Sequence, residues 1–448
     1  NDHANSLLWQ KVNSGVMPQN NTALPQSQID SIALWINEGA LEFPAIVQKT
    51  YVPDDNFEQA LIDLGYDDVL NDSVLTANIS GVTTLNVNND SISDLTGIED
   101  FTALTHLYCV GNELDSLDMS SNTALIHLTC WANQLTSLDV STNTALTFLW
   151  CQNNQLTSLD VSANTAITEL QCHSNNLDSL DVSNNTELEK LRCDHNQFTM
   201  LDLSNNIALD YIWCGNNQLT SLDLSNNTLL ETLKCGNNQL DSLDLSNNMA
   251  LTVFECQNNL FTTLDVSNNT ALTTLHCFGN QLTSLDVSAN SALTSLKCNS
   301  NQLTSLDVSN NTALTTLHCF GNQLTSLDVS ANSALTSLKC RYNDLTSLDV
   351  SANTALTNLN CSGNELTALD VSNNTALTSL KCNSNQLTYL NMRNGITDAL
   401  TTFDATDNTS LSCIETLDPD YATANWTYAN GNIDEGVLFS ETCSPGCT

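Results

Sequence analysis

Fourteen cysteines recur at intervals of 21 residues, from Cys109 to Cys382. Cysteine forms disulfides, binds soft metals and acts as a nucleophile, so this row is the first candidate for chemistry. Leucines surround each cysteine, however, as in segment 146–166, LTFLWCQNNQLTSLDVSANTA. Thiols stacked in parallel fit the disulfide dihedral poorly and do not converge on a metal. We therefore expect small, inert core residues.

A second periodic set consists of carboxylates. Counting each repeat from its first leucine, position 15 is aspartate thirteen times, from Asp118 to Asp370. The favoured interpretation is a solvated acidic stripe supported by neighbouring hydroxyls, in which repulsion raises the pKa values toward the middle of the row. The alternatives are calcium bridging, with Asp202, Asp223 and Asp244 as candidate ligands, and a lattice for mineral or ice. Calcium needs six to eight oxygens, and one carboxylate per repeat supplies few.

The third set is the variable one, at positions 3, 5 and 7 of the repeat. Seven of the ten lysines and arginines of the chain lie there, together with eight of its 25 aromatic residues. Exposed aromatic clusters are typical of binding sites, although β-propensity and recent duplication are competing explanations. The aromatic residues suit sugar rings or an apolar protein patch, and the lysines suit a carboxylate or sulfate polymer. The candidate binding face comprises Tyr108, Trp131, Phe148, Trp150, Lys190, Arg192, Tyr211, Trp213, Lys234, His276, Lys297, His318, Lys339 and Lys381.

The fixed period predicts the elements that must position these residues. Repeats of this length stack as coils of a solenoid, each burying its apolar face against its neighbours. Each half of a coil carries one short strand, which predicts two parallel sheets and little curvature. Alternation along the first strand points positions 4 and 6 inward and 3, 5 and 7 outward. The asparagines at positions 9 and 19 are expected to bond the turning backbone.

The phrase LxxLxCxxNxL resembles the leucine-rich repeat, in the short nested bacterial form called IRREKO-type. The resemblance covers residues 82 to about 392. It implies a β-rich leucine-rich-repeat solenoid of about 14–15 coils with two parallel β-sheets, a helical N-terminal cap and an irregular C-terminal cap. The solenoid is expected over 81–392, the N-terminal cap over 49–80 and the C-terminal cap over 393–448. Both caps resemble those of secreted Bacteroidetes proteins.

Residues 1–48 resemble the C-terminal half of a small c-type cytochrome domain. Two short helices are expected, from Ser6 through Val12 and from Ser27 to about Glu38. In that resemblance Met17 is the remnant of a haem axial ligand. No Cys-x-x-Cys-His motif occurs, so haem c is expected only if a missing upstream segment supplies it.

Three cysteines fall outside the periodic set. Cys413 with Cys443 is the favoured disulfide, and Cys443 with Cys447 is the alternative. Three Asp-Ser-Leu or Asp-Ser-Ile triplets resemble the O-glycosylation sites of exported Bacteroidetes proteins. Their serines are Ser91, Ser179 and Ser242.

Charge and motifs narrow the function. Ten basic residues stand against 50 acidic ones, a formal net charge of −40, which argues against nucleic-acid partners and anionic membranes. No stretch is apolar enough for membrane insertion, and no catalytic fingerprint occurs. We expect an exported, non-enzymatic adhesion protein that binds a polysaccharide or a surface protein. The alternatives are a self-assembling structural element and an electron-transfer protein whose haem domain is incomplete here. No cofactor is expected, with calcium left open.

Overall fold

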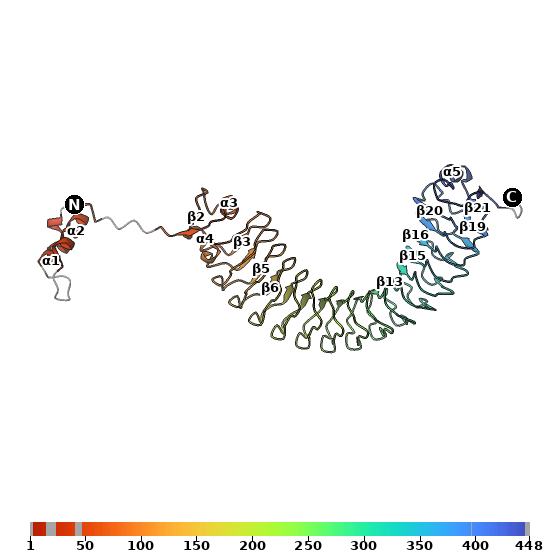
Figure 1. Cartoon of the computed structure of the whole chain (residues 1–448), viewed down its shortest axis with the longest axis horizontal. Coiled ribbons are helices and arrows are strands. Elements are labelled where there is room, and N and C mark those ends of the chain that lie inside the picture. The colour runs from red at the N-terminus through yellow and green to blue at the C-terminus, as the bar shows by residue number, and fades with distance from the viewer. Residues whose placement is uncertain (1–2, 15–23, 41–46, 396, 444–448) are drawn as a thin grey trace.

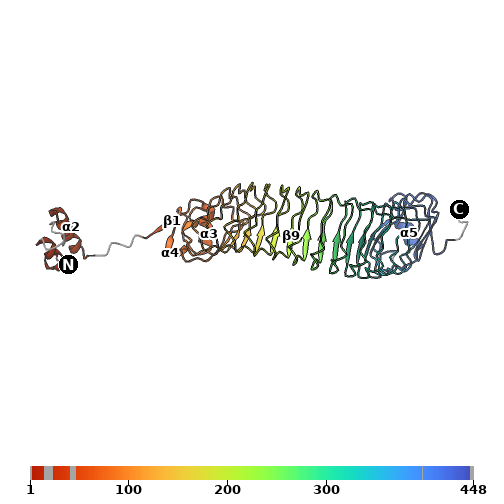
Figure 2. The ribbon, with the colours of Figure 1, turned by 90° about the horizontal axis from the view of Figure 1, so that it is seen from below.

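The computed structural model describes residues 3–14, 24–40, 47–395 and 397–443. The repeats form a solenoid that bends into an arc (Figure 1), and the view turned by 90° shows its coils side by side along the arc (Figure 2). The main sheet has 16 parallel strands. Fourteen come from the cysteine-containing coils, and one more precedes and one follows them. In sheet order from the N-terminal end they are β3 (Thr84–Asn86), β4 (His106–Tyr108), β5 (His127–Thr129), β6 (Phe148–Trp150), β7 (Glu169–Gln171), β8 (Lys190–Arg192), β9 (Tyr211–Trp213), β10 (Thr232–Lys234), β11 (Val253–Glu255), β12 (Thr274–His276), β13 (Ser295–Lys297), β14 (Thr316–His318), β15 (Ser337–Lys339), β16 (Asn358–Asn360), β18 (Ser379–Lys381) and β20 (Thr402–Asp404).

The second sheet is present but short. Its four strands lie at the C-terminal end and are β17 (Ala368–Asp370), β19 (Tyr389–Met392), β21 (Cys413–Thr416) and β22 (Leu438–Ser440). In the other described coils the second half is extended without a named strand, and an isolated bridge joins Asp118 to Asp139. The expected two parallel sheets are therefore confirmed, with very unequal lengths.

The expectation of little curvature is wrong. Strands β13, β15, β16 and β20 lie on the inner side of the arc, and β19 and β21 lie on the outer side (Figure 1). Ladder hydrogen bonds hold neighbouring strands about 4.8 Å apart on the inner side. The outer halves lack such a ladder over most of the arc, so they can spread and the solenoid bends toward the main sheet.

The core lies between the two halves of each coil. Leucines at positions 1, 4 and 11, the cysteine at position 6 and the Val or Leu at position 16 are buried in coil after coil. The fourteen ladder cysteines are free thiols, and burial raises the pKa of each, for example that of Cys277 to about 12. A thiol that is both buried and protonated is neither nucleophile nor metal ligand at neutral pH. The expected burial of the fourteen thiols in the core is confirmed.

Two rows of buried asparagines hold neighbouring coils together. At position 9, the Nδ2 of Asn154 donates to the carbonyls of Cys130 and Cys151, and its Oδ1 accepts from the amide of Leu135. At position 19, the Nδ2 of Asn248 donates to the carbonyls of Leu224 and Asn227 in the preceding coil. The Oδ1 of each position-19 asparagine, from Asn122 to Asn374, is buried without a described hydrogen-bond partner. The expected structural role of both rows is confirmed.

Each coil turns at position 8, where the backbone φ is positive. The residues there include Gly111, Asn153, His195 and Tyr342, with φ between 53° and 67°. This turn bends the chain away from the strand directly after position 7. Position 7 is therefore less open than alternation predicts, and Gln152 is more than nine-tenths buried.

The N-terminal cap closes the first coil. Helix α3 (Asp55–Asp63) is capped by Asp54, which accepts from the amides of Asn56 and Phe57. Its buried stripe includes Phe57 and Leu61. An antiparallel pair completes the cap, with a short helix and a 3₁₀ turn beside it. These elements are β1 (Lys49–Tyr51), β2 (Ser73–Leu75), α4 (Thr76–Ile79) and η2 (Ile98–Asp100).

The segment before this cap contains η1 (His3–Asn5), α1 (Leu7–Asn13) and α2 (Gln26–Asn37). Ser6 caps α1 by accepting from the amide of Trp9 at 3.5 Å. Both helices lie within one residue or so of their expected bounds. Met17 lies outside the described residues, so the structure says nothing of it.

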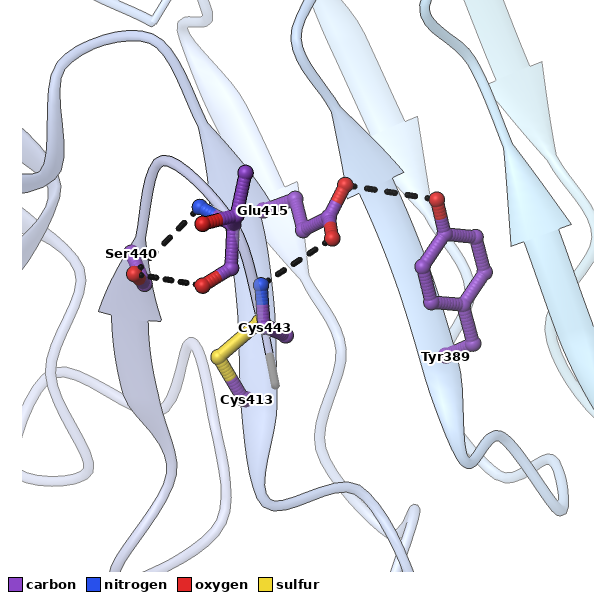
Figure 3. Close-up of a disulfide and its surroundings, with 6 residues drawn as sticks. Tyr389, Cys413, Glu415, Ser440 and Cys443 are labelled. Carbon is purple, nitrogen blue, oxygen red and sulfur yellow. Dashed lines mark hydrogen bonds between the residues drawn. A yellow bond between two sulfur atoms is a disulfide. The ribbon is translucent and has the colours of Figure 1, made fainter. Parts of the chain in front are cut away.

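The C-terminal cap is more regular than expected. Strand β20 adds a further coil to the main sheet beyond residue 392, with Phe403 and Ala405 at positions 4 and 6 and Asn408 at position 9. Helix α5 (Pro419–Asn425) then covers the last coil. A disulfide joins Cys413 in β21 to Cys443, with Cα atoms 5.9 Å apart, and Glu415 accepts from the amide of Cys443 (Figure 3). Cys447 lies outside the described residues.

Candidate binding face

The predicted binding residues lie on one surface. We call it the inner face, meaning the side chains at positions 3, 5 and 7 of the main sheet, whose strands lie on the inner side of the arc. Position 5 of each strand pairs with position 5 of the next, as Arg192 does with Trp213 and Trp213 with Lys234. Residues 21 apart in sequence are therefore neighbours in space, and the face divides into three clusters along the arc.

The first cluster is aromatic and centres on His127 in β5. Its ring lies 5.1 Å from that of Tyr108, 5.2 Å from Phe148 and 5.7 Å from Trp150, measured between centroids. The ring of His106 stacks on it at 5.8 Å. Burial, followed by the charge of His106, lowers the pKa of His127. A neutral imidazole makes this an apolar, ring-lined surface at neutral pH. Trp131 takes no part in the ring contacts found among the described residues.

The second cluster combines cations with an aromatic ring. The guanidinium carbon of Arg192 lies 4.0 Å from the Trp213 ring centroid, and the Nζ of Lys234 lies 5.0 Å from it. Such contacts contribute about 0.5–1 kcal/mol each at partly exposed sites. They hold the indole between two cations while its cluster still faces solvent.

Acidic partners complete the second cluster. The Nζ of Lys234 lies 3.2 Å from the Oε1 of Glu255, and the Nδ1 of His276 lies 3.8 Å from the same oxygen. Asp194, whose side chain is 1% exposed, lies 2.9 Å from the Nε of Arg192 and 2.7 Å from the Nδ1 of His195. Lys190 and Tyr211 lie opposite each other at position 3. Binding the Asp194 carboxylate fixes the Arg192 guanidinium over Trp213.

Sequence reasoning missed Glu255 and Asp194 because it selected only bases and aromatic residues. The signal was available in the spacing. Glu255 is 21 residues after Lys234 and 21 before His276, so the parallel register places it between them. Asp194 stands at position 7 of the coil that carries Arg192.

The third cluster is a basic row in the C-terminal half. Along position 5, strands β12 to β18 carry His276, Lys297, His318, Lys339, Asn360 and Lys381 in continuous register. Burial, followed by the charges of Lys339 and Lys297, lowers the pKa of His318 to about 4. The histidines are therefore neutral at pH 7, and the lysines carry the charge.

Position 7 beside this row holds Phe278 and Phe320, with the Arg341 guanidinium carbon 4.5 Å from the Phe320 ring centroid. At position 3 lie small hydroxyl residues, and the Nε2 atoms of His276 and His318 lie 3.2 Å from the Oγ atoms of Ser295 and Ser337. The row thus has two phenylalanines, alternating with Asn299 and Arg341, along one side and short polar residues along the other.

The Asp row lies on the outer halves of the coils, and the expected rise in its pKa values is wrong. The Oδ1 of Asp223, like its neighbours in the row, accepts from the backbone amide two residues on, here Ser225 at 3.0 Å. Hydrogen bonds from Ser225 lower the pKa of Asp223, outweighing the opposing charges of Asp202 and Asp244. Solvent screens these exposed like charges, whereas the local hydrogen bond stabilises the anion directly.

Calcium binding by the Asp row stays a prediction. Among the described residues, the acidic group whose ligand atoms lie within 4.8 Å of one another is Asp55, Glu58 and Asp72. Glu58 is buried there, and its carboxylate accepts from the amides of Asn71 and Asp72. Those bonds explain the cluster as part of the N-terminal cap.

The serines of the three triplets are accessible or hydrogen-bonded to their own aspartate. Ser179 and Ser242 donate to Asp178 and Asp241 at 2.8 and 2.9 Å. Ser91 has a positive φ of 57° and lies at the surface. Their glycosylation stays a prediction.

Comparison with known proteins identifies the type of repeat. No protein-family profile matches the chain. Internalin J of Listeria monocytogenes serotype 4b is 37% identical over 121 residues, which span 27% of this chain and 11% of the relative. The solved functional domain of InlJ from Listeria monocytogenes, described as including a cysteine ladder, is 38% identical with a TM-score of 0.76. That match covers 80% of this chain and 81% of the domain.

A leucine-rich-repeat protein from Leptospira interrogans has the same fold at 22% identity, with a TM-score of 0.66 over 76% of this chain and 91% of that one. Within the described part of the chain, no helix combines the length and the apolar character needed to cross a membrane.

Proposed function

Because the chain belongs to the leucine-rich-repeat proteins, we propose that it is a non-enzymatic binding protein that holds another protein on its inner face. The observation that carries the proposal is Trp213 held between Arg192 and Lys234. Trp and Arg are the residues most enriched among energetic hot spots of protein interfaces. Here both are pre-positioned by Asp194 and Glu255, which reduces the entropy lost on binding.

The arc favours a protein over a flat surface as partner. A concave sheet presents side chains from many coils to one convex object, which is how solenoids bind partners. The apolar ring cluster around His127 and the charged cluster around Trp213 lie on the same face, so one partner can contact both. Polysaccharide binding, self-assembly and electron transfer have no comparable support in the described residues.

The test uses display libraries of peptides and small protein domains selected on the full chain, with a glycan array in parallel. Ligands of the inner face should bind Trp213→Ala roughly 30-fold more weakly, which corresponds to a hot-spot loss of about 2 kcal/mol. The control is Leu229→Ala, which removes another apolar side chain, 58% exposed and outside the strands. Protein ligands that bind both variants equally, or binding by glycans alone, would contradict the proposal.

We also propose that the protein is exported. Disulfides persist in oxidising compartments and are rare in the cytosol, and the Cys413–Cys443 pair lies in the partly exposed C-terminal cap. Alkylation of the protein from its natural source, followed by mass analysis, should find these two cysteines oxidised. Quantitative alkylation of both without prior reduction would exclude export to an oxidising compartment.

A further inference from the structure

The basic row has a periodicity of its own. Lys297, Lys339 and Lys381 are 42 residues apart and stand at position 5 of β13, β15 and β18, with one strand between each pair. We call these three the lysine row. Two strand spacings amount to about 9.6 Å. The surface therefore presents one positive charge about every 9.6 Å along the solenoid axis.

These lysines lack the partners that the second cluster has. Lys234 pairs with Glu255, whereas no described carboxylate forms an ion pair with any member of the lysine row, although Asp404 in β20 stands opposite Lys381 in register. From β12 to β18, every residue at positions 3, 5 and 7 is neutral or basic. In a chain of formal net charge −40, a basic strip without ion pairs on the concave side, with its acidic neighbour Asp404 only at the C-terminal end, points to a ligand that brings its own negative charge.

The strip also has a shape. Phe278 and Phe320 lie along one side at position 7, and small residues such as Ser295 and Ser337 lie along the other at position 3. Between the lysines at position 5 lie His318, whose lowered pKa keeps it neutral at pH 7, and Asn360. Charged and neutral side chains therefore alternate along position 5 from Lys297 to Lys381.

An extended peptide matches this spacing. In the polyproline II conformation, a chain has three residues per turn and rises about 3.1 Å per residue, so every third side chain lies on one side at intervals of about 9.3 Å. Carboxylates at every third residue would meet the lysine row with a mismatch of about 0.3 Å per step. The aromatic side chains beside the row suit the proline rings of such a peptide.

We propose that the lysine row binds an extended acidic segment of the partner, with Asp or Glu at every third residue, running along the solenoid axis. This inference deepens the proposed function and rests on it, because it assigns chemistry to a second part of the same face. The lysine row lies C-terminal to the Trp213 cluster along the main sheet. The two clusters therefore act as separate subsites.

The experiment measures fluorescence anisotropy of labelled synthetic peptides with the full chain. One peptide repeats Glu-Pro-Pro and places glutamate at every third residue. A second has the same composition with its glutamates contiguous. We expect the spaced peptide to bind roughly fivefold more tightly, because contiguous charges cannot all reach lysines. Binding should weaken as salt is raised from low to physiological concentration.

Matched variants assign the site. The triple variant Lys297→Gln, Lys339→Gln, Lys381→Gln and the control Thr283→Glu, Thr304→Glu, Thr325→Glu each lower the formal charge from −40 to −43. The threonines are exposed on the coils between these strands, away from the inner face. The lysine variant should bind the spaced peptide roughly tenfold more weakly, and the threonine variant within twofold of wild type.

Three results would overturn the inference. They are equal binding of the two peptides, equal loss in the two variants, and tighter lysine-dependent binding of a polyuronate than of the spaced peptide. Trp213→Ala separates this inference from the proposed function. It should leave peptide binding unchanged, whereas it should weaken the library ligands described above. If the spaced peptide does not bind but Trp213→Ala still weakens the library ligands, only the proposed acidic subsite is wrong and the proposed function stands.

Discussion

At the scale of single residues, the two asparagine rows contribute more specific interactions between coils than the cysteine row by which the repeat is first recognised. A ladder cysteine contributes burial, which a small apolar residue could largely replace. A position-19 asparagine such as Asn248 instead satisfies two carbonyls of the preceding coil, at 3.1 and 2.9 Å. Each of these carbonyls also accepts from a backbone amide, that of Asn227 or Leu230, so the side-chain amide adds a second, buried donor that joins one coil to the next.

Asn248→Ala is therefore expected to lower the free energy of unfolding by about 2 kcal/mol, since it removes two buried hydrogen bonds between coils, while each carbonyl keeps its backbone donor. The matched control is Asn247→Ala. Asn247 is exposed, and its Nδ2 makes one bond, to the carbonyl of Ser225 at 3.1 Å. The control should change stability by less than about 1 kcal/mol. Urea denaturation followed by circular dichroism measures both, and similar losses in the two variants would show that burial of the amide is irrelevant.

At the scale of the element, strand interiors could be predicted from the sequence and turns could not. The pattern at positions 4 and 6 depends only on local alternation, so the burial of Leu149 and Cys151 follows directly. Position 7 depends on the left-handed turn at position 8. That position holds glycine or asparagine in many coils but His195 and Tyr342 in others, so the turn signal is diluted and Asp194 is more buried than alternation predicts.

The candidate face was predictable for the same reason, and its internal pairing was predictable only in part. Outward positions identify Trp213 and Lys297 from sequence alone. Which charges neutralise one another depends on register between coils, and only the offset of 21 residues relates Glu255 to Lys234 and His276. The curvature required knowledge of both halves at once, because it arises from a continuous ladder on one side and a broken one on the other.

At the scale of the whole molecule, the two sides of the solenoid have opposite electrostatic character. The outer halves carry the Asp row, whose carboxylates are stabilised as anions by local hydrogen bonds. The inner face carries most of the basic residues and four histidines whose pKa values are lowered, chiefly by burial. Both sets make the folded protein more stable against unfolding at neutral pH than in acid, and they act in different pH ranges.

The pH dependence of stability follows from these directions. The pKa values of His173 and His318 are lowered from 6.5 to about 4 in the folded protein, so acidification protonates them first in the unfolded chain. The free energy of unfolding is therefore full above pH 6.5 and falls as the pH drops from 6.5 toward 4. The Asp row, with pKa values lowered below 3.8, adds a second loss that begins as the pH falls below about 4.

Replacing His318 tests the first range. His318→Gln should flatten the fall between pH 7 and pH 4.5 by about 1 kcal/mol, after allowing for solvent screening of a half-buried ring. Thr325→Ala, an exposed change in the same coil, should leave the slope unaltered. Urea denaturation at a series of pH values gives both slopes.

A His318→Gln slope equal to that of wild type would mean that the ring is as readily protonated in the folded protein as in the unfolded chain. A steeper slope would mean that protonation of His318 stabilises the folded protein. Because each coil contacts only its neighbours, the effect of this one histidine should add to that of the distant His173.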